Sequence, residues 1–249
     1  MPLLELRQIS KSFGGLNAVR DVSINLADRE MRAIIGPNGA GKSTLFNIIA
    51  GTFPPSTGEI YFAGLSLLGR SSYEICQLGI SRTFQITAIY RGLTARENVR
   101  LAAQAKDPRR ARVLGGLAVF AAAAERADAA LEQLGLTAVA HRTAGSLSHG
   151  DQRLLELAMA VAQSPRVLLL DEPTQGLSVE ETAQTVETLA NLLAGQSIAV
   201  LLVEHDMEVV FRLAQTITVL HRGVVLAEGS PEAVRADTEV QRAYLGETD

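Results

Sequence analysis

The sequence predicts an α/β fold with a mainly parallel sheet, an antiparallel β part near the N-terminus and an inserted helical part. Three observations lead to this prediction. Apolar runs of roughly four to eight residues alternate with helical patterns in the second half of the chain, which is typical of a parallel sheet covered on both faces. The first third shows short strand patterns separated by turns. From Thr94 to about Gly145, the composition becomes rich in Ala and Arg with helical periodicity.

The elements are expected in the following order. The first third contains strands, one helix and a further strand after a turn, in the segments LLELRQISKSF, DVSINL, MRAIIG, KSTLFNIIAG and PPSTGEIYFAG. In the helical part, AAAAERADAALEQLGL is a helix and DPRRARVLGG is a loop or a frayed helix end. Helices and strands then alternate in the segments RLLELAMAVAQS, RVLLLD, VEETAQTVETLANLLAG, SIAVLLVE, HDMEVVFRLA, TITVLH and GVVLAEG. The tail PEAVRADTEVQRAYLGETD is expected to form one or two short helices.

We expect these elements to form a single domain over residues 1–249. Within it, residues 1–93 and 151–230 form the catalytic core with its antiparallel β part. Residues 94–150 form the helical subdomain, and residues 231–249 form a C-terminal helical tail.

Composition excludes several classes of protein. The formal net charge of −4 weighs against a protein whose main work is coating nucleic acid. Cys76 is the only cysteine, so a disulfide framework and a cysteine-based metal site are both excluded, and a reducing compartment is expected. The N-terminus lacks the apolar region of a signal peptide, and no apolar stretch reaches the roughly 20 residues that span a bilayer. Any link to a membrane is therefore expected to come through partners.

A phosphate-binding loop is predicted at residues 36–43, GPNGAGKS, which match the Walker A pattern between an apolar strand and a helix. The glycines let backbone N–H groups turn towards phosphates, Lys42 reaches the β and γ oxygens, and the Ser43 hydroxyl is placed to bind Mg²⁺. The alternative is a glycine-rich turn before an ordinary helix, and the agreement of pattern and context favours the phosphate loop. The expected nucleotide-binding residues here are Gly36, Asn38, Gly39, Gly41, Lys42, Ser43 and Thr44.

Two acids follow the predicted strand VLLLD, at the edge of the sheet where the phosphate loop is expected. Asp171 can hold Mg²⁺ through water, and Glu172 can polarise a water that attacks the γ-phosphate. Taken alone, such a pair is more often a helix-capping turn. Next to a Walker A loop, the catalytic interpretation is favoured.

Three further residues are candidates for the same site. His205 follows the strand SIAVLLVE, where an imidazole can hydrogen-bond the γ-phosphate, although a lone histidine there is usually a solvated turn residue. Gln85 offers an amide to Mg²⁺ or to the attacking water, and the alternative is a polar strand end. Phe13 can stack on adenine or belong to the core. His141, His149 and His221 show no metal-ligand spacing.

The segment LSHGDQ, residues 147–152, opens a predicted helix and therefore forms a second anion site. The Walker A loop already uses its own helix N-terminus for the phosphates. Short connections make it difficult for this segment to fold over that loop within one chain. We therefore expect LSHGDQ to contact the ATP held by another molecule.

These motifs, in this order, resemble the nucleotide-binding subunits of ABC transporters, and the resemblance covers essentially the whole chain. It implies a P-loop NTPase core and two ATP molecules sandwiched in a head-to-tail dimer. It further implies that Ser148 and Gly150 contact the partner's γ-phosphate, that Glu172 is the general base, that His205 is the switch histidine and that Phe13 is the adenine-stacking aromatic.

The sequence departs from the family pattern at three positions. His149 replaces a glycine and Asp151 replaces the usual glutamine of the LSGGQ motif, while the serine and glycine expected to touch phosphate remain. Ser178 stands where the family commonly has aspartate, so a charged contact across the dimer interface is replaced by a neutral one.

The segments FGGLNAVRDVS, GISRTFQ, LVEHDMEVVF and QRAYLGE resemble the subfamily that serves branched-chain amino-acid importers. This resemblance implies a second ATPase subunit, two permease subunits and, indirectly, an extracytoplasmic solute-binding protein, with the chain at the cytoplasmic face of the membrane. It implies permease contact through ITAIYRGLTAREN, whereas DPRRARV is expected to be solvated.

Other functions remain open at this point. Importer ATPases for urea, amides or aromatic acids are closely similar, and a soluble ABC ATPase shares the catalytic core. A GTPase would require an N-K-x-D motif, which the sequence lacks. A non-hydrolysing regulatory subunit would be expected to lose Glu172 or His205, and both are present.

Overall fold

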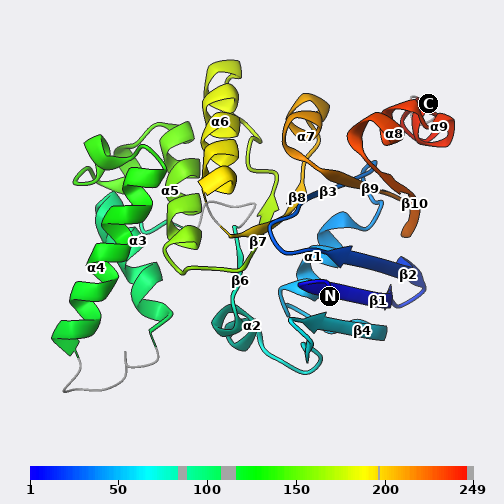
Figure 1. Ribbon diagram of the computed structural model, residues 1–249, viewed down its shortest axis with the longest axis horizontal. Coiled ribbons are helices and arrows are strands. Elements are labelled where there is room, and N and C mark those ends of the chain that lie inside the picture. Colours follow the sequence, from blue (N-terminus) through cyan, green and yellow to red (C-terminus); the bar gives the residue numbers. More distant parts are fainter. Residues whose placement is uncertain (84–88, 108–115, 196, 246–249) are drawn as a thin grey trace.

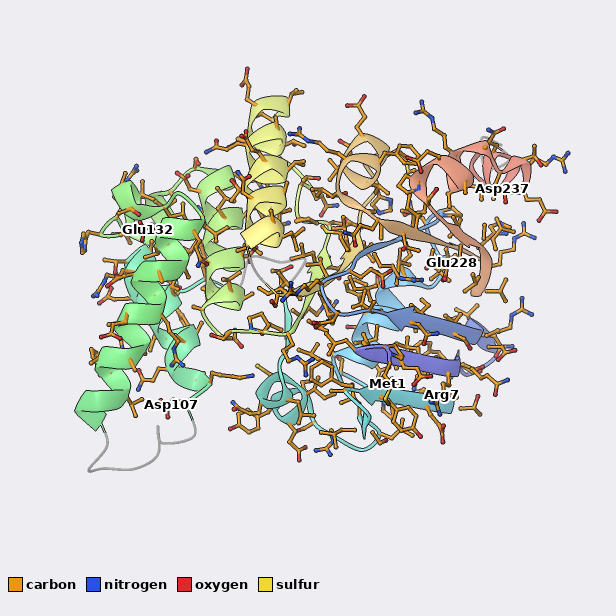
Figure 2. All side chains as sticks on the ribbon, viewed as in Figure 1. Met1, Arg7, Asp107, Glu132, Glu228 and Asp237 are labelled. Carbon is orange, nitrogen blue, oxygen red and sulfur yellow. The ribbon has the colours of Figure 1, made fainter. Side chains whose placement is uncertain are left out.

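Two β-sheets and a group of helices make up the computed structural model, which describes residues 1–83, 89–107, 116–195 and 197–245. Figure 1 shows the helical part on the left and the larger sheet running from it towards the right, above the smaller sheet. Side chains in Figure 2 follow this division, with Glu132 in the helical part and Arg7 on the smaller sheet. The predicted α/β fold class is confirmed.

The larger sheet contains β3 (Met31–Ile35), β6 (Ile80–Arg82), β7 (Val167–Asp171), β8 (Ala199–Val203), β9 (Thr216–His221) and β10 (Val224–Gly229). In the part of the chain that the structure describes, their order is β10-β9-β3-β8-β7-β6. All neighbours are parallel except β9 and β10, which form an antiparallel hairpin. The carboxyl ends of β3, β7 and β8 therefore meet at one edge of the sheet, where the expected catalytic residues follow.

The smaller sheet is antiparallel and contains β1 (Leu4–Phe13), β2 (Leu16–Leu26), β4 (Thr57–Phe62) and β5 (Leu65–Ser66) in the order β2-β1-β4-β5. β2 begins well before the expected segment DVSINL, because irregularities in its pairing with β1 let one strand continue through polar residues. Gln8 and Asp21 have positive φ angles of 49° and 50° at these irregularities. Arg20 N–H donates to the carbonyl oxygen of Gly223 at 2.7 Å, which ties β2 to the β9–β10 turn.

Each central strand of the larger sheet is buried on both faces. All residues of β7 and β8 are buried. Leu168 and Leu170 pack in the hydrophobic cluster of the helical side, whereas Val167 and Leu169 pack in the cluster that contains the smaller sheet. This two-sided packing explains why the strands are continuous apolar runs without alternation.

The helices are α1 (Lys42–Ile49), α2 (Ser72–Leu78), α3 (Ala95–Ala105), α4 (Gly116–Gln133), α5 (His149–Val161), α6 (Val179–Gly195), α7 (Met207–Leu213), α8 (Pro231–Ala236) and α9 (Thr238–Leu245). Short 3₁₀ turns occur at η2 (Thr137–Val139) and η3 (Ala144–Ser146). α8 and α9 confirm the expected short helices of the tail. No helix among the described residues is long and apolar enough to cross a membrane.

The sequence analysis missed α2. Its start has a clear signal, because Ser71 and Glu74 form a reciprocal capping box: the Ser71 hydroxyl accepts from the N–H of Glu74, whose carboxylate accepts from the N–H of Ser71. Thr94 and Glu97 form the same motif at the start of α3, where a helix was expected.

The helical part consists of α3, α4 and α5, which contact one another. α5 also contacts α6 and β6, so this helix joins the helical part to the larger sheet. The expected boundary between residues 150 and 151 falls within the first turn of α5, and the division of the chain into parts stays a prediction.

Candidate functional site

The segment GPNGAGKS connects β3 to α1, and its three glycines adopt backbone angles that other residues rarely adopt. Gly36, Gly39 and Gly41 have φ angles of 149°, 79° and 104°. A Cβ atom on Gly36 would lie 2.0 Å from the carbonyl oxygen of Leu220, so β9 closes directly on the back of the loop. Gly41 is the N-cap residue of α1 and directs the first-turn N–H groups of this helix towards the loop.

Lys42 is buried, and its ammonium group closes the loop from the inside. Its Nζ donates to the carbonyl oxygens of Gly36 at 2.6 Å and Pro37 at 3.0 Å. The ammonium charge adds to the positive end of the α1 dipole. This arrangement favours a bound anion such as a phosphate group.

A cleft of 580 Å³ opens over this loop. It brings Phe13 of β1, Glu172 and His205 together with the phosphate loop. Most of the expected nucleotide-binding residues line it: Asn38, Gly39, Gly41, Lys42, Ser43 and Thr44. Arg222 also lines the cleft and was not expected. Gly36 and Asp171 are buried behind its surface.

Asp171, the last residue of β7, is paired with Arg82 at the end of β6. Arg82 Nη2 lies 2.8 Å from Asp171 Oδ2, and the exposed fractions of the two side chains are 13% and 2%. Arg82 Nη1 also donates to Asn47 Oδ1 of α1 at 2.7 Å. The guanidinium group therefore holds the carboxylate in place and balances its charge where water is scarce.

Glu172 and His205 meet across the cleft at the ends of β7 and β8. His205 Nε2 lies 2.6 Å from Glu172 Oε1. The Glu172 N–H donates to the carbonyl oxygen of Val203 at 2.9 Å, and Glu172 has a positive φ angle of 50°. A positive φ angle is unusual for a residue with a side chain, so neighbouring contacts hold Glu172 in this conformation.

Glu204 organises the turn that carries His205, and the sequence analysis did not identify it. Its buried carboxylate accepts from the N–H and the hydroxyl of Thr174 and from the N–H of His205 at 2.7 Å. The two segments that carry Glu172 and His205 are thereby joined through one charged group. An acid directly after a buried strand, in LLVEH, was the available signal.

Phe13 lies at the rim of the cleft and is 47% exposed. Its ring meets Phe53 edge to face at a centroid distance of 5.4 Å. Lys11 Nζ lies 5.3 Å from the Phe13 centroid and 5.0 Å from that of Phe53. These contacts hold the ring at the rim of the cleft, where its exposed part can contact a bound base.

The residues expected to form a second anion site, Ser148 and Gly150, lie at the start of α5. Ser148 is the N-cap residue, and its hydroxyl accepts from the N–H of Asp151 at 3.0 Å. The N–H of Gly150 donates to Glu181 Oε1 at 3.1 Å. Ser148 and Gly150 do not line the cleft over the phosphate loop, and Figure 1 shows α5 apart from α1. Gln85 and the segment DPRRARV lie outside the described residues.

Comparison with known proteins decides the family. Residues 19–175 match the family described as ABC transporter, and residues 224–249 match the family described as branched-chain amino acid ATP-binding cassette transporter. The branched-chain amino acid transport ATP-binding protein LivG of Salmonella typhimurium is 40% identical over 99% of this chain and 98% of its own length. BraF of Pseudomonas aeruginosa, described in the same terms, is 39% identical over the same shares. The chain belongs to the ABC transporter family.

Solved structures of other ABC transporter cassettes have the same fold as this ABC ATPase over more than nine tenths of its length. An ATP-binding cassette of an ABC transporter in its ADP conformation has a TM-score of 0.86 and 30% identity, covering 99% of this chain and 100% of its own. A dimeric bacterial ABC transporter cassette has a TM-score of 0.78 and 28% identity, covering 92% and 98%. The expected family, fold class and ATPase activity are thus confirmed: this ABC ATPase binds and hydrolyses ATP.

Proposed function

We propose that this chain is the ATP-binding subunit of an importer for branched-chain amino acids and that it hydrolyses ATP in a head-to-tail pair of ATPase subunits. The observation that carries this proposal is the similarity to LivG and BraF over 99% of the chain. The match of residues 224–249 to the branched-chain amino acid family adds a second, C-terminal similarity.

The cleft over the phosphate loop holds ATP. Backbone N–H groups of residues 38–44 and the Lys42 ammonium bind the phosphates, while Phe13 stacks on adenine. The Ser43 hydroxyl would bind Mg²⁺ and the Asp171 carboxylate would hold the ion through water, since oxygen atoms are the ligands this ion takes, and the ion would balance the phosphate charge. Gln85 is assigned to the same ion by resemblance.

Hydrolysis uses the pair of side chains at the ends of β7 and β8. Glu172 accepts a proton from a water molecule as the water oxygen attacks the γ-phosphorus, and the bond to the β,γ-bridging oxygen breaks to give ADP and phosphate. His205 would hydrogen-bond the γ-phosphate, and its Nε2 lies 2.6 Å from Glu172 Oε1 in the structure, close enough to position that carboxylate. Ser148 and Gly150 complete the site of the other subunit.

The other partners are two permease subunits, with a solute-binding protein acting on the outer side of the membrane. A groove of 250 Å³ between β6, α3 and α5 is suited to a permease segment, and Leu101, Met159 and Tyr90 are among its lining residues. Tyr90 belongs to the segment ITAIYRGLTAREN and is 60% exposed. Contact with the permeases would hold the chain at the cytoplasmic face of the membrane. No nucleic acid is among the proposed partners.

Uptake of labelled leucine, isoleucine, valine and urea by native cells tests this function, with chromosomal Glu172→Gln compared with the parental chain. The purified Glu172→Gln chain should bind ATP normally but hydrolyse it about 10²- to 10⁴-fold more slowly, because the amide cannot accept the proton. Cells with this chain should lose uptake of the three amino acids and retain urea uptake.

Glu180→Gln is the matched control, because it removes an exposed carboxylate from the same chain. Loss of urea uptake alone would assign the chain to a different solute. Unchanged uptake of all four compounds would contradict the proposed transport function, and normal hydrolysis by Glu172→Gln would contradict the role of Glu172.

A further inference from the structure

One carboxylate, that of Glu181, binds the start of two different helices. Glu181 lies in the first turn of α6, and its Oε2 accepts from the N–H of Ser178 at 3.0 Å. The Ser178 hydroxyl in turn accepts from the N–H of Glu181 at 3.3 Å, which completes a capping box. The other carboxylate oxygen, Oε1, accepts from the N–H of Gly150 in α5 at 3.1 Å.

The Glu181 carboxylate also packs closely against α5. A Cβ atom on Gly150 would lie 2.9 Å from Glu181 Oε1, so the carboxylate occupies the space directly beside this glycine. The N–H groups of Ser178 and Gly150 lower the pKa of Glu181, which is therefore ionised at neutral pH. Gly150 N–H belongs to the first turn of α5, whose N–H groups have no partner within the helix.

The same N–H group has a second expected partner. In the proposed head-to-tail pair, Gly150 contacts the γ-phosphate of the ATP held by the other subunit. One N–H proton makes one strong hydrogen bond, so a phosphate oxygen and Glu181 Oε1 compete for it. Two anions at this distance would also repel each other in an interface with little water.

We propose that Glu181 occupies the phosphate-binding N–H of Gly150 while the subunits are apart and that the partner's ATP displaces it when they close. This inference rests on the proposed head-to-tail pair. Glu181 is a positioning residue that opposes closure until ATP is present. Because the same carboxylate caps the turn at Ser178, displacement from Gly150 also changes the link between that turn and α5.

The ATP dependence of hydrolysis tests the proposal in the transporter purified through a tag on this chain. Glu181→Gln keeps an acceptor but removes its charge, and hydrogen bonds to charged acceptors are about twice as strong as neutral ones. We expect the KM for ATP to fall about fivefold and kcat to stay within about twofold. Glu180→Gln, which removes an exposed charge from the same turn, should leave both constants unchanged.

Glu181→Asp gives an independent variant if Glu181→Gln fails to assemble. It keeps the charge, but its side chain is one methylene shorter and cannot reach Gly150 from the same backbone position. The KM for ATP should fall in this variant too. An unchanged or raised KM in the assembled variants, or an equal fall in Glu180→Gln, would overturn the proposal, because Glu181 would then serve only as a helix cap.

A separate experiment tests whether the head-to-tail pair forms. Glu172→Gln chains in the purified transporter should associate through ATP, which crosslinking of the ATPase subunits can measure. Loss of that association would contradict the pair itself. Association together with an unchanged KM in Glu181→Gln would contradict only the role of Glu181.

Discussion

At the scale of single residues, the buried ion pair between Arg82 and Asp171 is a contact that no sequence motif predicted. Removing one partner of a buried ion pair leaves the other charge uncompensated. Arg82→Ala should therefore lower the free energy of unfolding by about 3–5 kcal/mol, measured by urea denaturation.

Arg7→Ala is the matched control for that measurement. Arg7 Nε lies 2.8 Å from Glu5 Oε1, the same separation as in the buried pair, but the Arg7 side chain is 53% exposed. Water screens this pair, so its loss should destabilise the chain much less than the loss of Arg82 does. Equal losses in the two variants would show that burial does not set the strength of the Arg82–Asp171 pair.

At the scale of elements, the phosphate loop depends on how closely β9 approaches it. Alanine at Gly36 or Gly39 has an unfavourable backbone conformation that costs about 1–2 kcal/mol. Gly36→Ala adds a clash with the Leu220 carbonyl oxygen, whereas a Cβ atom on Gly39 meets nothing within 4 Å. Urea denaturation should find Gly36→Ala less stable than Gly39→Ala by about 1–3 kcal/mol. Equal stabilities of the two variants would mean that β9 can move away from the added methyl group without lowering the free energy of unfolding.

The start of α3 provides a pH-dependent prediction. Hydrogen bonds from the backbone and hydroxyl of Thr94 lower the pKa of Glu97 below its usual value. A lowered pKa contributes stability that is present at neutral pH and is lost as the pH falls through the folded-state value. Glu97→Gln should thus destabilise the chain at pH 7, and the difference from the parental chain should shrink below about pH 4.3.

Thermal or urea unfolding between pH 7 and 3.5 measures this effect. Glu132→Gln, which removes an exposed carboxylate from α4, should match the parental chain throughout. A difference for Glu97→Gln that stays constant with pH would contradict the capping interaction as its cause.

The order and type of most elements could be predicted because each has a local cause. Strands with two buried faces are apolar runs, and helices such as α6 have one buried stripe. β2 was predicted too short, because its continuation depends on pairing with β1. α2 was missed although its capping box is visible in the sequence, since its short helical segment has only one buried residue.

At the scale of the whole molecule, the sequence predicted the separate motifs of the site but not the long-range contacts that hold them together. The phosphate loop, Glu172 and His205 are recognisable because fixed spacing follows from backbone geometry, and the structure brings all three into one cleft. Arg82, Glu204 and Glu181 act through partners far away in the sequence: Asp171, Thr174 and Gly150. Their pairing depends on the strand order and on helix packing, which no local pattern encodes.

The strand order also determines when the protein can first bind its nucleotide. β3 pairs with β8 and β9, whose residues are made long after the phosphate loop has left the ribosome. At a synthesis rate of about 5–20 residues per second, β3 remains unpaired for on the order of ten seconds. The helices α3, α4 and α5 lie closer together in the chain and can pack earlier. A nascent chain released before β9 would keep its GPNGAGKS segment but lack the strand that shapes it.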